Sequence, residues 1–236
     1  MIAIGFDLDH TLLLDNAVER TIALEMLAQL ARSRNVAYDA AAAEAAVDQA
    51  LVTFRNGKIV LETVLEGFFQ GLLGPDESNE LEAARFRDVV CERAGEFVRA
   101  LPGCSELLAA LDAAGVRYAA LSNGWSPLQE EKARLIGFAA PVYVSERIGL
   151  RKPAREAFEF LASHLEYPAD QVWYVGDDPI VDCGGALACG MTALWLDWEG
   201  RPYPDDVAPP SRRIGSLAEL TTLVQGQLTG AAKAAE

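Results

Sequence analysis

Polar residues that could take part in catalysis occupy four places in the sequence. Three of the places follow a short apolar stretch and one precedes a predicted helix. They are Asp7-Leu8-Asp9-His10-Thr11, Ser122-Asn123-Gly124, Arg151-Lys152-Pro153 and Gly176-Asp177-Asp178 with the nearby Asp182. In an open parallel sheet, ligands bind beyond the carboxyl ends of the strands, so these four segments are expected to meet at one edge. Together they supply carboxylates, a hydroxyl group and an ammonium group.

This set of groups is typical of a site for a metal ion and a phosphate. Several carboxylates that converge in a water-poor crevice repel one another unless a cation lies among them. Mg²⁺ prefers oxygen ligands and commonly binds through one or two carboxylates and a substrate phosphate. Lys152 and Ser122 could then bind phosphate oxygens, one as a charge and the other as a hydrogen-bond donor.

The rest of the sequence indicates which elements position these groups. Residues 1–6 form an apolar run typical of a strand buried on both faces. Residues 16–34, 39–54, 60–72 and 78–100 have helical spacing or composition. After Leu101-Pro102-Gly103 the pattern alternates. Helices are predicted at 105–114, 126–136, 153–165, 182–189 and 216–225, and strands at 116–121, 142–144, 172–175 and 192–196, with a proline-rich loop at 202–210 and a frayed tail from 229.

Such alternation predicts an α/β fold, a Rossmann-like parallel sheet with helices on both faces. The predicted core domain comprises residues 1–14 and 100–236. Residues 15–99 are predicted to be an inserted, all-helical domain between the first strand and the others.

The four segments resemble the motifs of the haloacid dehalogenase superfamily, in the order in which that family carries them. Residues 7–11 look like the first motif, Ser122 the second, Lys152 the third, and residues 176–182 the acidic fourth. The inserted segment resembles a helical cap of the C1 type, expected to close over the site and to select the substrate. The resemblance covers the first strand and about residues 100–197.

The resemblance implies a role for each motif residue. Asp7 would be the nucleophile that forms an aspartyl-phosphate, and Asp9 the acid and base, a pairing that their spacing allows. Ser122, Asn123 and Lys152 would bind the phosphate, and Thr11 would hold the loop geometry. Mg²⁺ would be bound by Asp7, Asp177 and the backbone carbonyl of Asp9. Asp178 and Asp182 would be further ligands or would support the ligands.

Asp9 also distinguishes branches of the superfamily. The dehalogenase branch attacks carbon, has no leaving alkoxide to protonate, and carries no acidic residue at this position. The sequence therefore favours a Mg²⁺-dependent phosphatase acting on a small soluble phosphomonoester. A phosphomutase of the same superfamily, a receiver domain phosphorylated on aspartate, and a binding module that has lost turnover are the alternatives. The motifs specify neither the leaving group nor the oligomeric state.

Composition limits the possible partners. The 236 residues include 20 Lys and Arg against 35 Asp and Glu, a net charge of −15, and 51% of the chain is apolar. Such an acidic chain is a poor match for nucleic acid or an anionic membrane. Four scattered cysteines indicate neither a zinc site nor a disulfide framework. With no signal peptide and no long apolar run, a cytoplasmic protein is expected.

Overall fold

The computed structural model describes residues 2–55 and 59–234, which divide into two compact units. One unit comprises the residues up to Leu14 and from Val98 onward, and the other is Asp15–Phe97. Within the described residues, no helix is long and apolar enough to cross a membrane.

The larger unit is built on a six-stranded parallel sheet with the strand order β5-β4-β1-β6-β7-β8. The strands are β1 (Ala3–Phe6), β4 (Tyr118–Ser122), β5 (Val142–Val144), β6 (Val172–Gly176), β7 (Thr192–Leu196) and β8 (Arg212–Ile214). After β1 the chain builds outward through β4 and β5, and then crosses to β6 on the other side of β1. The carboxyl ends of β1, β4 and β6 are therefore adjacent where the strand order reverses, which is where open α/β sheets bind ligands.

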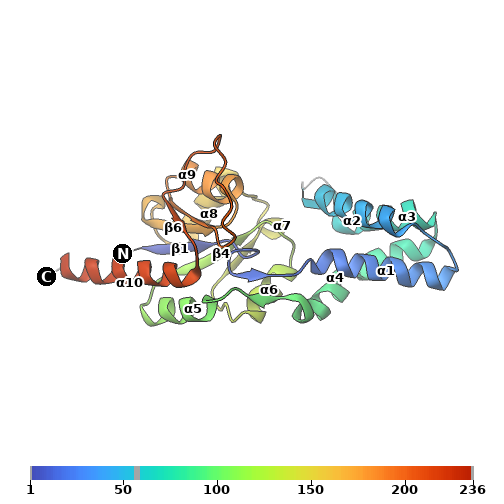
Figure 1. Cartoon of the computed structure of the whole chain (residues 1–236), viewed down its shortest axis with the longest axis horizontal. Helices are drawn as coiled ribbons and strands as arrows, with labels where there is room; N and C mark the ends of the chain where they lie inside the picture. The colour runs from blue at the N-terminus through green and yellow to red at the C-terminus, as the bar shows by residue number, and fades with distance from the viewer. Residues whose placement is uncertain (1, 56–58, 235–236) are drawn as a thin grey trace. The chain divides into compact units, whose positions relative to one another are not determined.

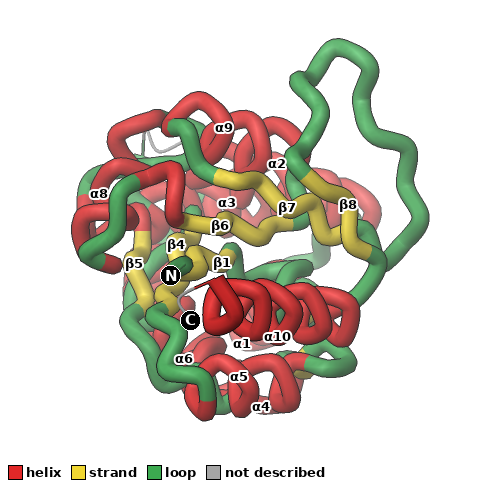
Figure 2. The backbone as a smooth tube through the Cα atoms, turned by 90° about the vertical axis from the view of Figure 1, so that its left-hand side faces the viewer, coloured by secondary structure: helices red, strands yellow, loops and turns green. Residues whose placement is uncertain are grey.

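Helices cover both faces of the sheet, as predicted. Figure 2 shows α8 (Arg155–Leu165) and α9 (Gly185–Cys189) on one face, and α5 (Cys104–Ala113) and α10 (Leu217–Ala234) on the other. Against α8 and α9, the sheet buries a continuous apolar cluster that includes Phe158, Leu161 and Trp195. The shorter elements are α6 (Leu128–Leu135), α7 (Ser145–Ile148), the single turn η1 (Ala169–Gln171) and the π-helical turn η2 (Pro179–Gly184).

The smaller unit consists of helices, which Figure 1 shows in blue to green. They are α1 (Val18–Arg34), α2 (Ala40–Arg55), α3 (Leu61–Leu73) and α4 (Glu77–Phe97). Their buried faces carry apolar residues at helical spacing, among them Leu27, Phe69 and Phe86. The all-helical character predicted for this segment agrees with the structure.

Three local predictions were wrong. The helix expected to reach residue 100 ends at Phe97, because Arg99–Ala100 (β3) pairs antiparallel with Leu13–Leu14 (β2) in the sheet unit. The edge strand β8 was not predicted, because three residues that include two arginines show no apolar alternation. The last helix, α10, continues to Ala234 instead of ending near residue 225.

Candidate active site at the carboxyl ends of the strands

The loop after β1 places Asp7 in the protein interior. The Leu8 carbonyl accepts the backbone N–H groups of Leu12 and Leu13 at 2.9 and 3.2 Å, which closes the loop into a tight turn. The side chains of Leu8, Leu12 and Leu13 are fully buried and anchor this turn in the core. Asp7 follows the strand directly, and its own N–H donates to a carbonyl of β6. Its carboxylate is thereby fixed beyond the sheet edge.

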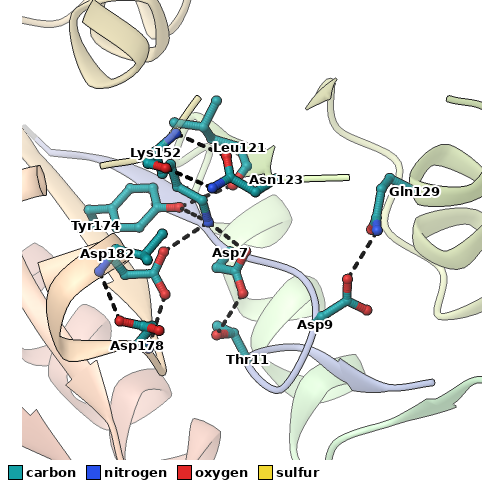
Figure 3. A network of polar contacts seen from close by, with 11 residues as sticks. Asp7, Asp9, Thr11, Leu121, Asn123, Gln129, Lys152, Tyr174, Asp178 and Asp182 are labelled. Carbon is teal, nitrogen blue, oxygen red and sulfur yellow. Dashed lines mark hydrogen bonds and ion pairs between the residues drawn. The ribbon is translucent and has the colours of Figure 1, made fainter. Parts of the chain in front are cut away.

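Lys152 lies at the centre of the site, in contact with three other side chains (Figure 3). Its Nζ donates to Asp7 Oδ1 at 2.6 Å, to Asp182 Oδ1 at 2.8 Å and to the Tyr174 hydroxyl at 3.0 Å. Its side chain is only 2% exposed. An ammonium group so deeply buried must be paired, and two carboxylates meet that requirement.

Asn123 holds the backbone of Lys152 in place. Its Oδ1 accepts the Lys152 N–H at 2.9 Å, and its Nδ2 donates to the Lys152 carbonyl at 2.8 Å. From the sequence, Asn123 was expected to bind the substrate phosphate. In the structure both polar atoms of its side chain contact the backbone of Lys152, and the phosphate contact stays a prediction. Ser122, the other expected phosphate contact from this segment, ends β4 and is buried.

Three of the expected acidic residues form a cluster. Asp7, Asp177 and Asp182 each offer a carboxylate oxygen, and these oxygens lie within 4.8 Å of one another. Burial, followed by the neighbouring charge of Asp182, is the main cause that raises the pKa of Asp177 to about 6. The pKa of Asp7 is raised to about 8, chiefly by burial and also by the charge of Asp182, against the lowering effect of Lys152. The positive charge of Lys152 therefore does not fully offset the burial of these carboxyl groups.

The donor set of this cluster fits a hard divalent cation. All three candidate ligand atoms are carboxylate oxygens, which Mg²⁺ prefers over nitrogen and sulfur ligands. A cation among them would relieve the repulsion that burial imposes. The side chain of Asp9, which was also expected at the metal through its backbone, does not belong to this cluster.

Asp178 and Asp182 have distinct positions. The Asp178 carboxylate caps η2 by accepting the N–H groups of Ile180 and Val181, both at 2.8 Å. The Asp178 N–H in turn donates to Asp182 Oδ2 at 3.1 Å. Asp182 is thus a member of the cluster itself, whereas Asp178 orients it. Thr11, expected to hold the loop, lies with its Oγ1 3.4 Å from Asp7 Oδ2.

Asp9 points away from Asp7, toward the other side of the loop (Figure 3). Its Oδ1 accepts a hydrogen bond from Lys132 Nζ at 2.9 Å, and its Oδ2 accepts one from Gln129 Nε2 at 3.0 Å. Both donors come from α6, three residues apart, and therefore lie on one face of that helix. The Asp9 side chain is 31% exposed, whereas that of Lys132 is 1% exposed.

Four residues of the site were not predicted from the sequence: Tyr174, Gln129, Lys132 and Arg201. Tyr174 also donates from its hydroxyl to the Leu121 carbonyl at 3.1 Å. Arg201, from the loop before β8, donates through Nη2 to the Asp177 carbonyl at 3.1 Å and lies 3.3 Å from Asp177 Oδ2. The i, i+3 pair of Gln129 and Lys132, which begins five residues after Gly124, was the available signal.

Comparison with known proteins identifies the family to which this chain belongs. A family model for haloacid dehalogenase-like hydrolases matches residues 1–190. The pyrimidine 5′-nucleotidase YjjG of Escherichia coli is 27% identical over 177 residues, which cover 73% of this chain and 76% of that protein. The putative HAD-hydrolase YfnB of Bacillus subtilis is 26% identical over 222 residues, covering 91% of this chain and 92% of that one.

Solved structures share the fold. A crystal structure of YfnB bound to magnesium matches with a TM-score of 0.69 at 22% identity, covering 95% of this chain and 98% of that one. A 2-haloacid dehalogenase from Pseudomonas syringae matches with a TM-score of 0.74 at 22% identity, covering 96% and 100%. Both the predicted family and the predicted fold class are confirmed. Since the family model spans most of the sequence, the chain belongs to the haloacid dehalogenase-like hydrolases.

Proposed function

We propose that this protein is a Mg²⁺-dependent phosphatase that hydrolyses a small phosphomonoester through an aspartyl-phosphate on Asp7. The observation that carries the proposal is the arrangement of the two aspartates in one loop. Asp7 lies against Lys152 and the acidic cluster, while Asp9 is a separate carboxyl group held on the other side of the loop. Phosphoryl transfer needs both groups, a nucleophile and a proton donor.

In the first step, a carboxylate oxygen of Asp7 attacks the phosphorus atom of the substrate. A bond forms between that oxygen and phosphorus, and the bond from phosphorus to the leaving oxygen breaks. Asp9 gives its proton to the leaving oxygen, which departs as an alcohol. The ammonium group of Lys152, 2.6 Å from Asp7 Oδ1, can stabilise the negative charge of the transferring phosphoryl group.

In the second step, water attacks the phosphorus atom of the aspartyl-phosphate. Asp9, now a carboxylate, accepts a proton from that water molecule. The bond from phosphorus to the Asp7 oxygen breaks, which releases inorganic phosphate and regenerates both aspartates in their starting forms. Asp9 thus acts once as an acid and once as a base.

Asp7, Asp177 and Asp182 are the side chains proposed to hold Mg²⁺, with the Asp9 backbone carbonyl as a further ligand. A bound Mg²⁺ would supply positive charge that shields the attacking carboxylate from the substrate phosphate. Arg201 and Asp178 would orient the ligands Asp177 and Asp182.

The names of the relatives suggest which substrates to test first. They include a pyrimidine 5′-nucleotidase, a phosphoserine phosphatase and a glyceraldehyde 3-phosphate phosphatase. We expect a nucleoside monophosphate, an amino acid phosphate or a sugar phosphate to release inorganic phosphate when Mg²⁺ is present. Another relative is named as a 2-haloacid dehalogenase. We expect no release of halide from a 2-haloacid here, because the proposed role of Asp9 is to protonate a leaving oxygen, which a halide does not need.

The direct test measures release of phosphate from an aryl phosphate and from this panel, with Mg²⁺ or with EDTA. Asp7→Asn is expected to reduce turnover by about 10³-fold or more, since the amide is a poor nucleophile. Asp9→Asn is expected to reduce it by about 10²-fold or more. Full activity of Asp7→Asn, or release of halide instead of phosphate, would overturn the proposal.

A further inference from the structure

The two residues of α6 that contact Asp9 have no place in the mechanism described so far. A lysine 1% exposed on a short, highly charged helix is unusual, because a helix of this composition normally exposes its lysines to water. Placing the Lys132 ammonium in the interior costs free energy unless a partner compensates it. The carboxylate of Asp9, 2.9 Å away, is such a partner.

We infer that Lys132 and Gln129 are positioning residues that fix the Asp9 carboxyl group for its acid and base steps. Each takes one of the two Asp9 oxygens, so rotation about the last side-chain bond of Asp9 is blocked. Each oxygen keeps a second lone-pair direction for a proton transfer. The inference rests on the proposed phosphatase mechanism and adds to it the residues that control Asp9.

The neighbouring glycine supports this role independently. A Cβ atom at Gly124 would lie 2.4 Å from Gln129 Nε2 and 2.6 Å from Gln129 Cγ, closer than real atoms approach. Gly124 therefore leaves the space in which the Gln129 side chain reaches Asp9. In the segment Ser122-Asn123-Gly124, Asn123 contacts the backbone of Lys152, and the missing side chain of Gly124 leaves room for Gln129. One short segment thus serves both aspartates.

The two chemical steps depend on Asp9 to different degrees when the leaving group is good. A nitrophenolate leaves without needing a proton, so formation of the aspartyl-phosphate from p-nitrophenyl phosphate should depend little on Asp9. Hydrolysis of that intermediate still requires Asp9 to accept a proton from water. A poorly positioned Asp9 should therefore slow hydrolysis of the intermediate selectively, whereas general damage to the site should slow both steps.

The test is rapid acid quench of the full-length protein with Mg²⁺ and ³²P-labelled p-nitrophenyl phosphate, which measures formation and hydrolysis of the phosphoenzyme separately. In Lys132→Met, we expect hydrolysis to slow by about 10-fold or more and formation to change by less than about 3-fold. Lys132→Arg, which keeps the charge, should recover part of the loss. Arg134→Gln, on the exposed face of the same helix, is the matched control and should leave both rates unchanged.

Gly124→Ala is the second variant and leaves Lys132 intact. Its methyl group should displace Gln129 and produce the same selective slowing to a smaller degree, so it carries the test if Lys132→Met does not fold. Equal slowing of both steps, or no slowing, in these variants would overturn the role of Lys132 and Gln129. Failure of the wild-type protein to form a phosphoenzyme on Asp7 would instead overturn the proposed function, and this inference with it.

Discussion

Replacement of Lys152 by methionine should destabilise the sheet unit strongly. Lys152 pairs with the buried carboxyl groups of Asp7 and Asp182, and its side chain and that of Asp182 are each only 2% exposed. Methionine preserves most of the side-chain volume but removes the charge and the three hydrogen bonds that Nζ makes. Breaking a buried ion pair by removing one partner costs about 3–5 kcal/mol, because the other charge stays buried and uncompensated. We expect a loss of that size in the free energy of unfolding.

The assay follows from the distribution of tryptophan. All four tryptophans of the chain, Trp125, Trp173, Trp195 and Trp198, lie in the unit that contains Lys152. Urea unfolding followed by tryptophan fluorescence, in EDTA at pH 7, therefore reports on this unit and not on the helical one. The matched control is Arg155→Met, because Arg155 is 63% exposed and forms an ion pair with Glu159 on the surface of α8. Its loss should stay below about 0.5 kcal/mol.

A second substitution separates charge from packing. If uncompensated negative charge causes the loss, Asp182→Asn added to Lys152→Met should recover about 1–2 kcal/mol, although Asp182→Asn alone destabilises the wild-type protein. A loss in Lys152→Met no larger than in Arg155→Met would refute the reasoning about burial. A double variant no more stable than Lys152→Met would refute the reasoning about charge.

Three further outcomes are expected. The pKa values of Asp7 and Asp177 in the folded protein are raised, to about 8 and about 6. The metal-free protein should therefore lose stability as the pH rises from about 4 to 8. Mg²⁺ should raise the unfolding midpoint more at pH 8 than at pH 5, because the ligands carry more negative charge at pH 8. An equal effect of Mg²⁺ at both pH values would contradict the cluster as its site. Asn123→Ala should lower the free energy of unfolding in urea by about 1–3 kcal/mol, because it removes both hydrogen bonds to the backbone of Lys152. Wild-type stability of this variant would show that these two hydrogen bonds are dispensable. Gly185→Ala should cost a similar amount, since its Cβ would lie 2.2 Å from an aromatic ring of α8, and an unchanged unfolding midpoint would mean that α9 shifts freely.

The backbone positions of the site were accessible from the sequence because strand ends are local features. Asp7 and Asp177 each follow an apolar run directly, and a parallel sheet brings such ends to one edge. The helical character of Asp15–Phe97 was equally accessible, since its apolar residues recur at helical spacing. Where a short-range pattern determines the structure, the prediction agreed with it.

The missed residues depend on tertiary packing that a short-range pattern does not encode. Tyr174 lies within a buried strand, and its hydroxyl gives no sign in the sequence that it will meet Lys152. Lys132 belongs to the segment Leu128–Leu135, whose charges suggest a helix exposed to water. Arg201 lies in the long connection between β7 and β8, and its contact with Asp177 has no local pattern in the sequence. In each case the partner is far away in the chain.

The two aspartates of the first loop are held by separate sets of residues, and this separation has a functional consequence. Asp7 accepts a hydrogen bond from the buried Lys152, which is also paired with Asp182. The Asp9 oxygens accept hydrogen bonds from Lys132 and Gln129 of α6. Asp7 must keep a fixed position against charges that would repel a free carboxylate. In the proposed mechanism Asp9 exchanges a proton with two different partners in one cycle, which a partly exposed carboxyl group held by two hydrogen bonds can do. Substitutions in α6 should therefore act first on Asp9, and on Asp7 through the charge of Asp9, which is among the causes that raise the Asp7 pKa.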